Sequence, residues 1–157
     1  MSDSVAPRLP AATWAAVVQH APLVSIDLIL EDTQGRILLG MRNNRPAQGY
    51  WFVPGGAIHK GETLDVAFGR IAEQELGLTL CRRDAEFIGV QEHHYADCFL
   101  GEQFGTHYVV LPYKICLSDT SGLTMDNQHR EWVWMPVAEL LAHPQVHENV
   151  KAYFVLV

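Results

Sequence analysis

A carboxylate on the apolar face of a helix is the feature that most constrains this chain. The segment GAIHKGETLDVAFGRIAEQELGL, residues 56–78, predicts a helix that starts near Thr63 and ends at Gly77. At about 100° per residue its apolar side chains fall on one face: Leu64, Phe68, Ile71, Ala72 and Leu76. Glu75 projects onto the same face, about 20° from Leu64. A carboxylate there either reaches water near the helix end or binds a partner or a cation.

The other patterns are typical of one globular domain with a mixed sheet. Of the 157 residues, 48% are hydrophobic and 18% charged, which is enough for a buried core. Strands are expected over 23–30, 36–42, 50–53, 86–95, 106–117 and 131–135. Helices are expected over 13–19, with Thr13 as the cap, and over 136–143 and 145–157. Hairpins without a regular βα alternation favour an α/β or α+β sandwich.

Composition also excludes several classes of partner. The net charge of −7 argues against binding to a nucleic-acid backbone. The apolar runs are too short to span a membrane, and no basic stretch precedes an apolar run at the N-terminus. The three cysteines are widely spaced and form no CxxC pair: Cys81, Cys98 and Cys116. We therefore expect reduced thiols in a cytoplasmic protein.

The segment 56–78 has the spacing of a known motif, and the chain resembles the Nudix hydrolases. The matching residues are Gly56, Glu62, Arg70, Glu75 and Gly77. The resemblance implies one Nudix domain over residues 1–157, an α/β/α sandwich with a mixed sheet. In this family a loop–helix–loop motif carries Mg²⁺ and a diphosphate. Ile71 and Gln74 stand where the motif has glutamates, so Glu75 alone keeps the acidic cluster.

The missing glutamates match one branch of that family, the GDP-mannose mannosyl hydrolases. The chain resembles this branch in NRPAQGYWFVPGG (44–56), in APLVS (21–25), in THYVVL (106–111) and in Gln128-His129. The resemblance implies hydrolysis of GDP-mannose, with GDP-glucose as a further substrate. Water attacks the anomeric carbon with inversion and releases GDP. The expected partners are a small nucleotide sugar and, in a homodimer, a second copy of the chain.

The same resemblance implies a metal site and a general base. One Mg²⁺ per subunit, with Mn²⁺ as a substitute, would bind the carbonyl of Gly55 and the side-chain oxygens of Glu75 and Gln128. These hard oxygen ligands suit Mg²⁺. By the same resemblance His129 matches the general base of the branch. A histidine that titrates near neutral pH can accept a proton from water. Taken alone, a loop histidine is more often only an exposed side chain.

Two arginines and a set of polar and aromatic positions complete the predicted site. Arg42 matches a cation that contacts the diphosphate, and its two-pronged donors suit phosphate oxygens. Arg70 either takes part in catalysis or braces the fold. The substrate-binding positions implied by the resemblance are Arg8, Leu9, Trp14, Asp27, Arg42, His93 and Tyr108. Of these, Trp14 lies in an N-terminal segment (1–20) expected to contact nucleotide or a second subunit, and it equally suits packing into the domain.

One departure from the branch and two other functions stay open. The branch commonly has an arginine after its double glycine, where this chain has Ala57; Arg45 is a candidate replacement. A diphosphatase that attacks phosphorus is one alternative. A sensor that binds a nucleotide sugar without turnover is the other, and the retained Glu75, Gln128 and His129 argue against it.

Overall fold

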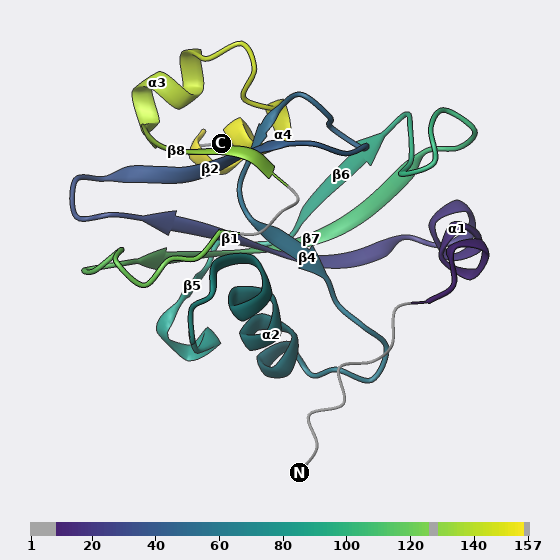
Figure 1. The fold of residues 1–157 in the computed structure, drawn as a ribbon, viewed down its shortest axis with the longest axis horizontal. Coiled ribbons are helices and arrows are strands. Elements are labelled where there is room, and N and C mark those ends of the chain that lie inside the picture. The colour runs from purple at the N-terminus through teal and green to yellow at the C-terminus, as the bar shows by residue number, and fades with distance from the viewer. Residues whose placement is uncertain (1–8, 126–128, 156–157) are drawn as a thin grey trace.

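A mixed sheet, eight-stranded over the described part of the chain, forms the centre of the molecule (Figure 1). The computed structural model describes residues 9–125 and 129–155, without the side chains of 129 and 130. At the centre of the sheet, β1 (Leu23–Glu31) runs parallel to β7 (Thr106–Cys116) over the whole length of β1. This parallel pair contains Asp27 on β1 and Tyr108 on β7.

Shorter strands extend this central pair on both sides. On one side β2 (Arg36–Arg42) pairs antiparallel with β1, and β3 (Trp51–Phe52) and β8 (His129–Pro136) pair with β2. On the other side β5 (Glu86–Phe87) and β6 (Gln91–Tyr95) pair with β7. The three-residue strand β4 (Gly55–Ala57) pairs antiparallel with the first half of β1.

Helices cover both faces of the sheet, which confirms the expected α/β/α sandwich. Figure 1 shows α2 (Leu64–Leu76) on one face and α3 (Val137–Ala142) with α4 (Glu148–Lys151) on the other. A 3₁₀ turn, η2 (Ala152–Phe154), follows α4. The helix α1 (Ala11–His20) lies beside the end of β7, and a 3₁₀ turn, η1, spans Arg82–Asp84.

The alternation of β1 side chains explains the two cores. Leu28 and Leu30 belong to a buried cluster with Phe68 of α2. Ile29 points to the opposite face and packs in a cluster with Leu140 of α3. Asp27 shares that second face because side chains two positions apart along a strand lie on the same side. Asp27 is therefore a buried polar residue on the same face as the apolar Ile29.

The ends of α2 agree with their sequence signals. The Thr63 hydroxyl accepts a hydrogen bond from the backbone N–H of Val66 at 3.2 Å, and Gly77 closes the helix at a φ of 66°. Glu75 is buried on the apolar face, as its periodicity predicts. Leu64, however, is 37% exposed, because it occupies the first turn and the buried cluster begins only at Ala67.

Several predicted boundaries are wrong, each for a local reason. The first helix begins at Ala11 after Pro10, so Thr13 is not its cap. The run 86–95 is divided into β5 and β6 around Gly89, which has a φ of 108°. The strand expected over 50–53 does end before Pro54, but a further strand that was not predicted, β4, begins at Gly55. β8 begins at His129, two residues before the predicted strand.

Two further expectations concern the tail and the cysteines. The helices of the tail are shorter than predicted, since 143–147 lies outside them. All three cysteines are free, with Cys98 buried and the other two exposed. Within the described ranges, no helix has the length and apolar character needed to cross a membrane.

Candidate active site

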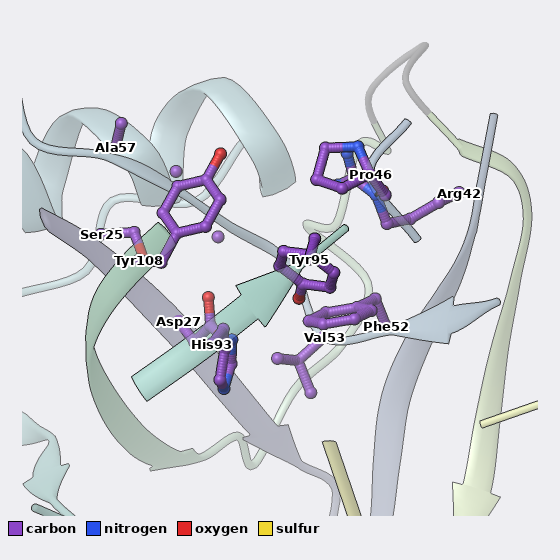
Figure 2. Close-up of a pocket in the computed structure, with 12 residues that line it drawn as sticks. Ser25, Asp27, Arg42, Pro46, Phe52, Val53, Ala57, His93, Tyr95 and Tyr108 are labelled. Carbon is purple, nitrogen blue, oxygen red and sulfur yellow. Dashed lines mark hydrogen bonds between the residues drawn. The ribbon is translucent and has the colours of Figure 1, made fainter. Parts of the chain in front are cut away.

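A small pocket of about 90 Å³ lies between β1, β4 and the β6–β7 pair (Figure 2). Five residues predicted from the sequence line it: Asp27, Arg42, Gly55, His93 and Tyr108. They come from five different strands, so only the folded sheet brings them together. In Figure 2, Arg42 stands beside Pro46 at one side of the pocket and Tyr108 toward the other. Arg42 is held there by a hydrogen bond of 2.9 Å from its Nε to the Pro46 carbonyl.

Asp27 places a carboxyl group in the floor of this pocket. Only 7% of the residue is exposed, and the Tyr153 hydroxyl donates a hydrogen bond of 2.5 Å to its Oδ2. Burial raises the pKa of Asp27 to about 7, while the Tyr153 hydrogen bond and the charge of Arg42 act in the opposite direction. The pocket thus contains a carboxyl group that exchanges its proton near neutral pH.

His93 lies next to this carboxyl group and is equally enclosed. The residue is 4% exposed, its ring packs against Phe52 and Tyr95, and its Nε2 lies 3.4 Å from the Tyr153 hydroxyl. Burial, together with the nearby His147, lowers the pKa of His93 to about 4. The imidazole is therefore neutral at physiological pH.

The buried imidazole gives a pH-dependent contribution to stability. Between about pH 6.5 and pH 4 the unfolded chain takes up a proton at His93 that the folded chain does not, so stability falls as the pH is lowered. The slope from this group is roughly 1.4 kcal/mol per pH unit. In His93→Gln this contribution is absent. The unmodified protein loses stability between pH 7 and pH 5 through His93 and the variant does not, so the difference between their free energies of unfolding is expected to narrow.

Urea unfolding at several pH values measures this effect. The matched control is His94→Gln, since His94 is the neighbour on the same strand with 64% of its side chain exposed. A gap between His93→Gln and the unmodified protein that stays constant with pH would contradict the buried, neutral state of His93.

The backbone of β4 offers an oxygen ligand next to Asp27. Two hydrogen bonds fix the β1–β4 pattern, from Leu28 N to Pro54 O and from Ile58 N to Val24 O, both 2.8 Å. Because hydrogen-bonded and non-hydrogen-bonded pairs alternate along an antiparallel ladder, Asp27 and Gly55 form a non-hydrogen-bonded pair. The Gly55 carbonyl is therefore directed away from β1. A Cβ at Gly55 would contact the Asp27 carboxylate and lie 2.6 Å from the Ile26 carbonyl, so this position requires glycine.

A network of hydrogen bonds ties the loop after β4 to α2. The Arg70 guanidinium binds both carboxylate oxygens of Glu62, at 2.7 and 2.8 Å, and donates to the Ala57 carbonyl at 2.9 Å. Glu62 also accepts from the backbone N–H of His59 at 2.7 Å. These hydrogen bonds, Arg70 first, lower the pKa of Glu62. Arg70 thus braces the loop; a direct part in catalysis stays a prediction.

The carboxylate of Glu75 belongs to the same unit. A Cβ at Gly56 would lie 3.2 Å from Cγ1 of Ile71, so α2 packs directly on β4. Glu75 follows Ile71 by one helical turn and is buried on the same face. Among the described residues no three His, Cys, Asp or Glu side chains cluster as a metal site. A buried carboxylate and an outward carbonyl nevertheless fit a hard cation such as Mg²⁺, with further oxygen ligands from elsewhere.

Known proteins that are similar to this chain identify its family. A family model described as the NUDIX domain matches residues 21–155. The chain belongs to the Nudix family. The low-salt glycan biosynthesis protein Agl8 of Haloferax volcanii is 38% identical over 152 residues, which is 96% of this chain and 94% of that protein.

Solved Nudix structures share the fold. A MutT protein from Methanosarcina mazei Go1 superposes with a TM-score of 0.69 at 18% identity, covering 86% of this chain and 92% of the other. A MutT NUDIX hydrolase from Burkholderia pseudomallei gives a TM-score of 0.66 at 25% identity, with coverages of 85% and 96%.

Other predicted residues of this Nudix chain do not line the pocket. Trp14 packs with Val18, Leu23 and Cys98, and its ring lies 6.4 Å from that of Phe99. This is the packing role that the sequence left open for it. Leu9 is half-exposed on the surface. Arg8 and Gln128 lie outside the described residues, as does the side chain of His129.

Ala57, which stands where the branch has an arginine, and Arg45, its candidate replacement, lie in different places. Ala57 lines the pocket. Arg45 instead borders a neighbouring hollow, where its Nη1 lies 3.5 Å from Asp97 and 3.8 Å from Glu102. In this structure the guanidinium of Arg45 is thus directed to carboxylates. Its role as a replacement for the branch's arginine stays a prediction.

The register of β8 places the backbone of a further predicted residue next to Arg42. His129 pairs with Arg42 of β2, after a register shift between Gly40 and Arg42. The backbone of the expected base thus lies beside the strand position that carries the expected diphosphate ligand.

Among the polar side chains of the Nudix pocket and its surroundings, sequence reasoning missed Ser25, Tyr95 and Tyr153. Ser25 precedes Asp27 by two positions on β1 and so shares its face, a signal that strand alternation could have supplied. Tyr95 follows His93 by the same spacing. Tyr153 reaches Asp27 from 126 positions away, and no local pattern indicates that contact.

Proposed function

We propose that this Nudix hydrolase cleaves a nucleoside diphosphate sugar, GDP-mannose foremost and GDP-glucose as a further substrate, to GDP and free sugar. The observation that carries the proposal is the composition of the pocket. Asp27, His93 and Tyr108 offer polar groups suited to sugar hydroxyls. Arg42 and the Gly55 backbone, which suit a diphosphate and its cation, line the same pocket.

The full-length relative supports a sugar substrate. The 38% identity extends over 96% of this chain, and the name of that relative associates it with glycan biosynthesis. The resemblance to the mannosyl hydrolase branch supports attack at the sugar carbon. It further predicts a homodimer in the cytoplasm, with one Nudix domain over residues 1–157.

The proposed reaction transfers the glycosyl group to water. Arg42 binds phosphate oxygens of the substrate, while Asp27 and His93 orient the sugar. His129 takes a proton from water, the water oxygen bonds to the anomeric carbon, and the bond from that carbon to the phosphate oxygen breaks with its electron pair on the diphosphate. Bound by Gly55, Glu75 and Gln128, Mg²⁺ would neutralise charge on the leaving diphosphate.

Attack at carbon also accounts for the reduced carboxylate set. Attack at phosphorus benefits from metal ions that hold both the nucleophile and the leaving group. Attack at carbon needs a cation at the leaving diphosphate and a base near the sugar. The cation therefore does not have to hold the attacking water as well. One carboxylate on α2, Glu75, then suffices for a single ion, and we expect one Mg²⁺ per subunit.

A diphosphatase that attacks phosphorus is the second candidate. It is favoured by shorter matches to an ADP-ribose pyrophosphatase of Methanocaldococcus jannaschii, 40% identical over 57 residues, and to an RNA pyrophosphohydrolase of Wolbachia, 27% identical over 132 residues. The first of these covers 36% of this chain.

Hydrolysis in ¹⁸O-labelled water separates the candidates. With GDP-mannose and Mg²⁺ we expect one ¹⁸O atom in the released mannose, none in GDP, and inversion of the anomeric configuration in the first product detected by proton NMR. Label in a phosphate product would overturn carbon attack in favour of the diphosphatase. Tight binding of nucleotide sugars without turnover would contradict both and indicate a sensor.

A further inference from the structure

The C-terminal 3₁₀ turn places a hydroxyl group between two polar residues of the pocket. Tyr153 of η2 is 8% exposed and packs in the same core cluster as Leu140 and Val150. Its hydroxyl donates to Oδ2 of Asp27 at 2.5 Å and lies 3.4 Å from Nε2 of His93. Asp27, Tyr153 and His93 therefore form one hydrogen-bonded chain that joins β1, η2 and β6.

The single proton of the Tyr153 hydroxyl fixes the direction of this chain. In the folded structure the Tyr153 hydroxyl is the donor in its hydrogen bond to Oδ2 of Asp27, so its one proton is engaged there. The tyrosine oxygen then offers only lone pairs to His93, and Nε2 of His93 must carry the hydrogen. Since burial keeps the imidazole neutral, Nδ1 is left as an acceptor.

The second carboxylate oxygen of Asp27, Oδ1, is a hydrogen-bond acceptor like Nδ1 of His93. Oδ1 lies against β4, where a Cβ at Gly55 would contact it, and Asp27 and His93 both line the pocket. With Oδ2 engaged by Tyr153, Oδ1 is the oxygen that Asp27 can offer a ligand, and in the ionised carboxylate it is a hydrogen-bond acceptor. Two acceptors suit a ligand that donates hydrogen bonds, such as a polyol or a sugar, and they repel phosphate oxygens.

We propose that Tyr153 is a positioning residue that sets the hydrogen-bond polarity of Asp27 and His93, so that the pocket presents two acceptors to the hydroxyl groups of a sugar. The sugar as ligand rests on the proposed function; the fixed tautomer of His93 does not. The other titratable or charged side chains that act electrostatically on these groups are Arg42, Tyr95, Tyr108, His94 and His147. Tyr153 is the residue that η2 contributes to this chain of groups.

The tautomer of His93 tests the proposal without substrate or metal. Long-range ¹H–¹⁵N correlation spectra of the ¹⁵N-labelled protein in mildly alkaline buffer show which ring nitrogen carries the hydrogen, and His93→Gln identifies the signals. We expect His93 to be the Nε2–H tautomer in the unmodified protein and to lose that preference in Tyr153→Phe. An Nδ1–H tautomer in the unmodified protein would overturn the proposal even if the variant fails to fold.

A second buried tyrosine provides the matched control. Tyr113 is 4% exposed in the other core cluster, and its hydroxyl accepts from Arg82 at 3.4 Å. Tyr113→Phe removes a hydroxyl of similar burial away from the pocket, so the His93 signals should not change. A similar change in both variants would show a general loss of packing and would overturn a specific role of Tyr153.

Steady-state kinetics then tests the ligand. For GDP-mannose, Tyr153→Phe should raise KM about tenfold with kcat changed less than about twofold, because a ground-state hydrogen bond is weakened. With deoxy-sugar nucleotides that each lack one hydroxyl, at least one should lose this sensitivity. Equal KM for Tyr153→Phe and the unmodified enzyme would overturn the proposal while leaving the proposed function intact. If the unmodified protein turns over no nucleotide sugar, the proposed function fails and the NMR result alone decides the role of Tyr153.

Discussion

Replacing Glu75 by glutamine is expected to lower kcat/KM for a nucleotide sugar about a thousandfold, equivalent to ~4 kcal/mol of transition-state stabilisation. Glu75 is buried on the face of α2 that packs against the sheet. Glutamine keeps the shape of the side chain but removes its charge, and a neutral oxygen binds a divalent cation much more weakly. Since Glu75 is the one acidic residue that remains of the motif's cluster, no neighbouring glutamate on this helix face can take over.

Glu73→Gln is the matched control for this substitution. Glu73 lies on the same helix, two positions earlier, and is exposed. The same loss of charge there should leave turnover within about twofold, as is usual for surface substitutions. Mn²⁺ binding followed by electron paramagnetic resonance should weaken in Glu75→Gln and not in Glu73→Gln. Unchanged Mn²⁺ affinity in Glu75→Gln would remove this residue from the metal site, whatever happens to the rate.

The position of Glu75 could be predicted because all its signals are local. The capping residue Thr63, the terminal Gly77 and the spacing of the apolar side chains define α2 within one short segment. Periodicity then places Glu75 on the buried face, as the structure shows. The hydrogen bond from Arg70 to the backbone carbonyl of Ala57 could not be predicted in this way, because no pattern of side chains indicates a backbone partner.

The strand β4 could not be predicted from local propensity. Glycine is depleted in strands, so Pro54-Gly55-Gly56 indicates a break. In the structure the same glycines are required for pairing, because a side chain at Gly55 would contact the Asp27 carboxylate. The residue type that argues against a strand is thus the one that lets β4 approach β1 at the pocket.

Long-range contacts account for the rest of what the sequence did not indicate. The strand positions of Asp27 and His93 follow from alternation, but the hydroxyl that joins them comes from the C-terminal turn. The apolar pattern of the tail predicts helix there without indicating which pocket the helix end reaches. Tertiary packing, not propensity, determines that Tyr153 points to β1.

Replacing His129 by glutamine is the second large effect, with kcat expected to fall about a thousandfold and KM to change little. A general base contributes about 10²–10⁴ to a rate, and glutamine cannot accept a proton from water. The expectation rests on the resemblance and on the register of β8, in which the backbone of His129 pairs with Arg42. In the unmodified enzyme, kcat should decline as the pH falls through the titration range of a histidine, since the protonated form is not a base. This decline should be absent from the residual activity of His129→Gln.

The two substitutions are expected to fail in different ways, which separates the roles of the two residues. Glu75→Gln should weaken Mn²⁺ binding, whereas His129→Gln should bind Mn²⁺ and GDP as the unmodified protein does and lose only the proton acceptor. His94→Gln controls for the removal of a histidine, because its side chain is 64% exposed and it does not line the pocket. Turnover of His129→Gln equal to that of His94→Gln would exclude His129 as the base. With a neutral His93 already in the pocket, that result would direct the search for a proton acceptor to β6.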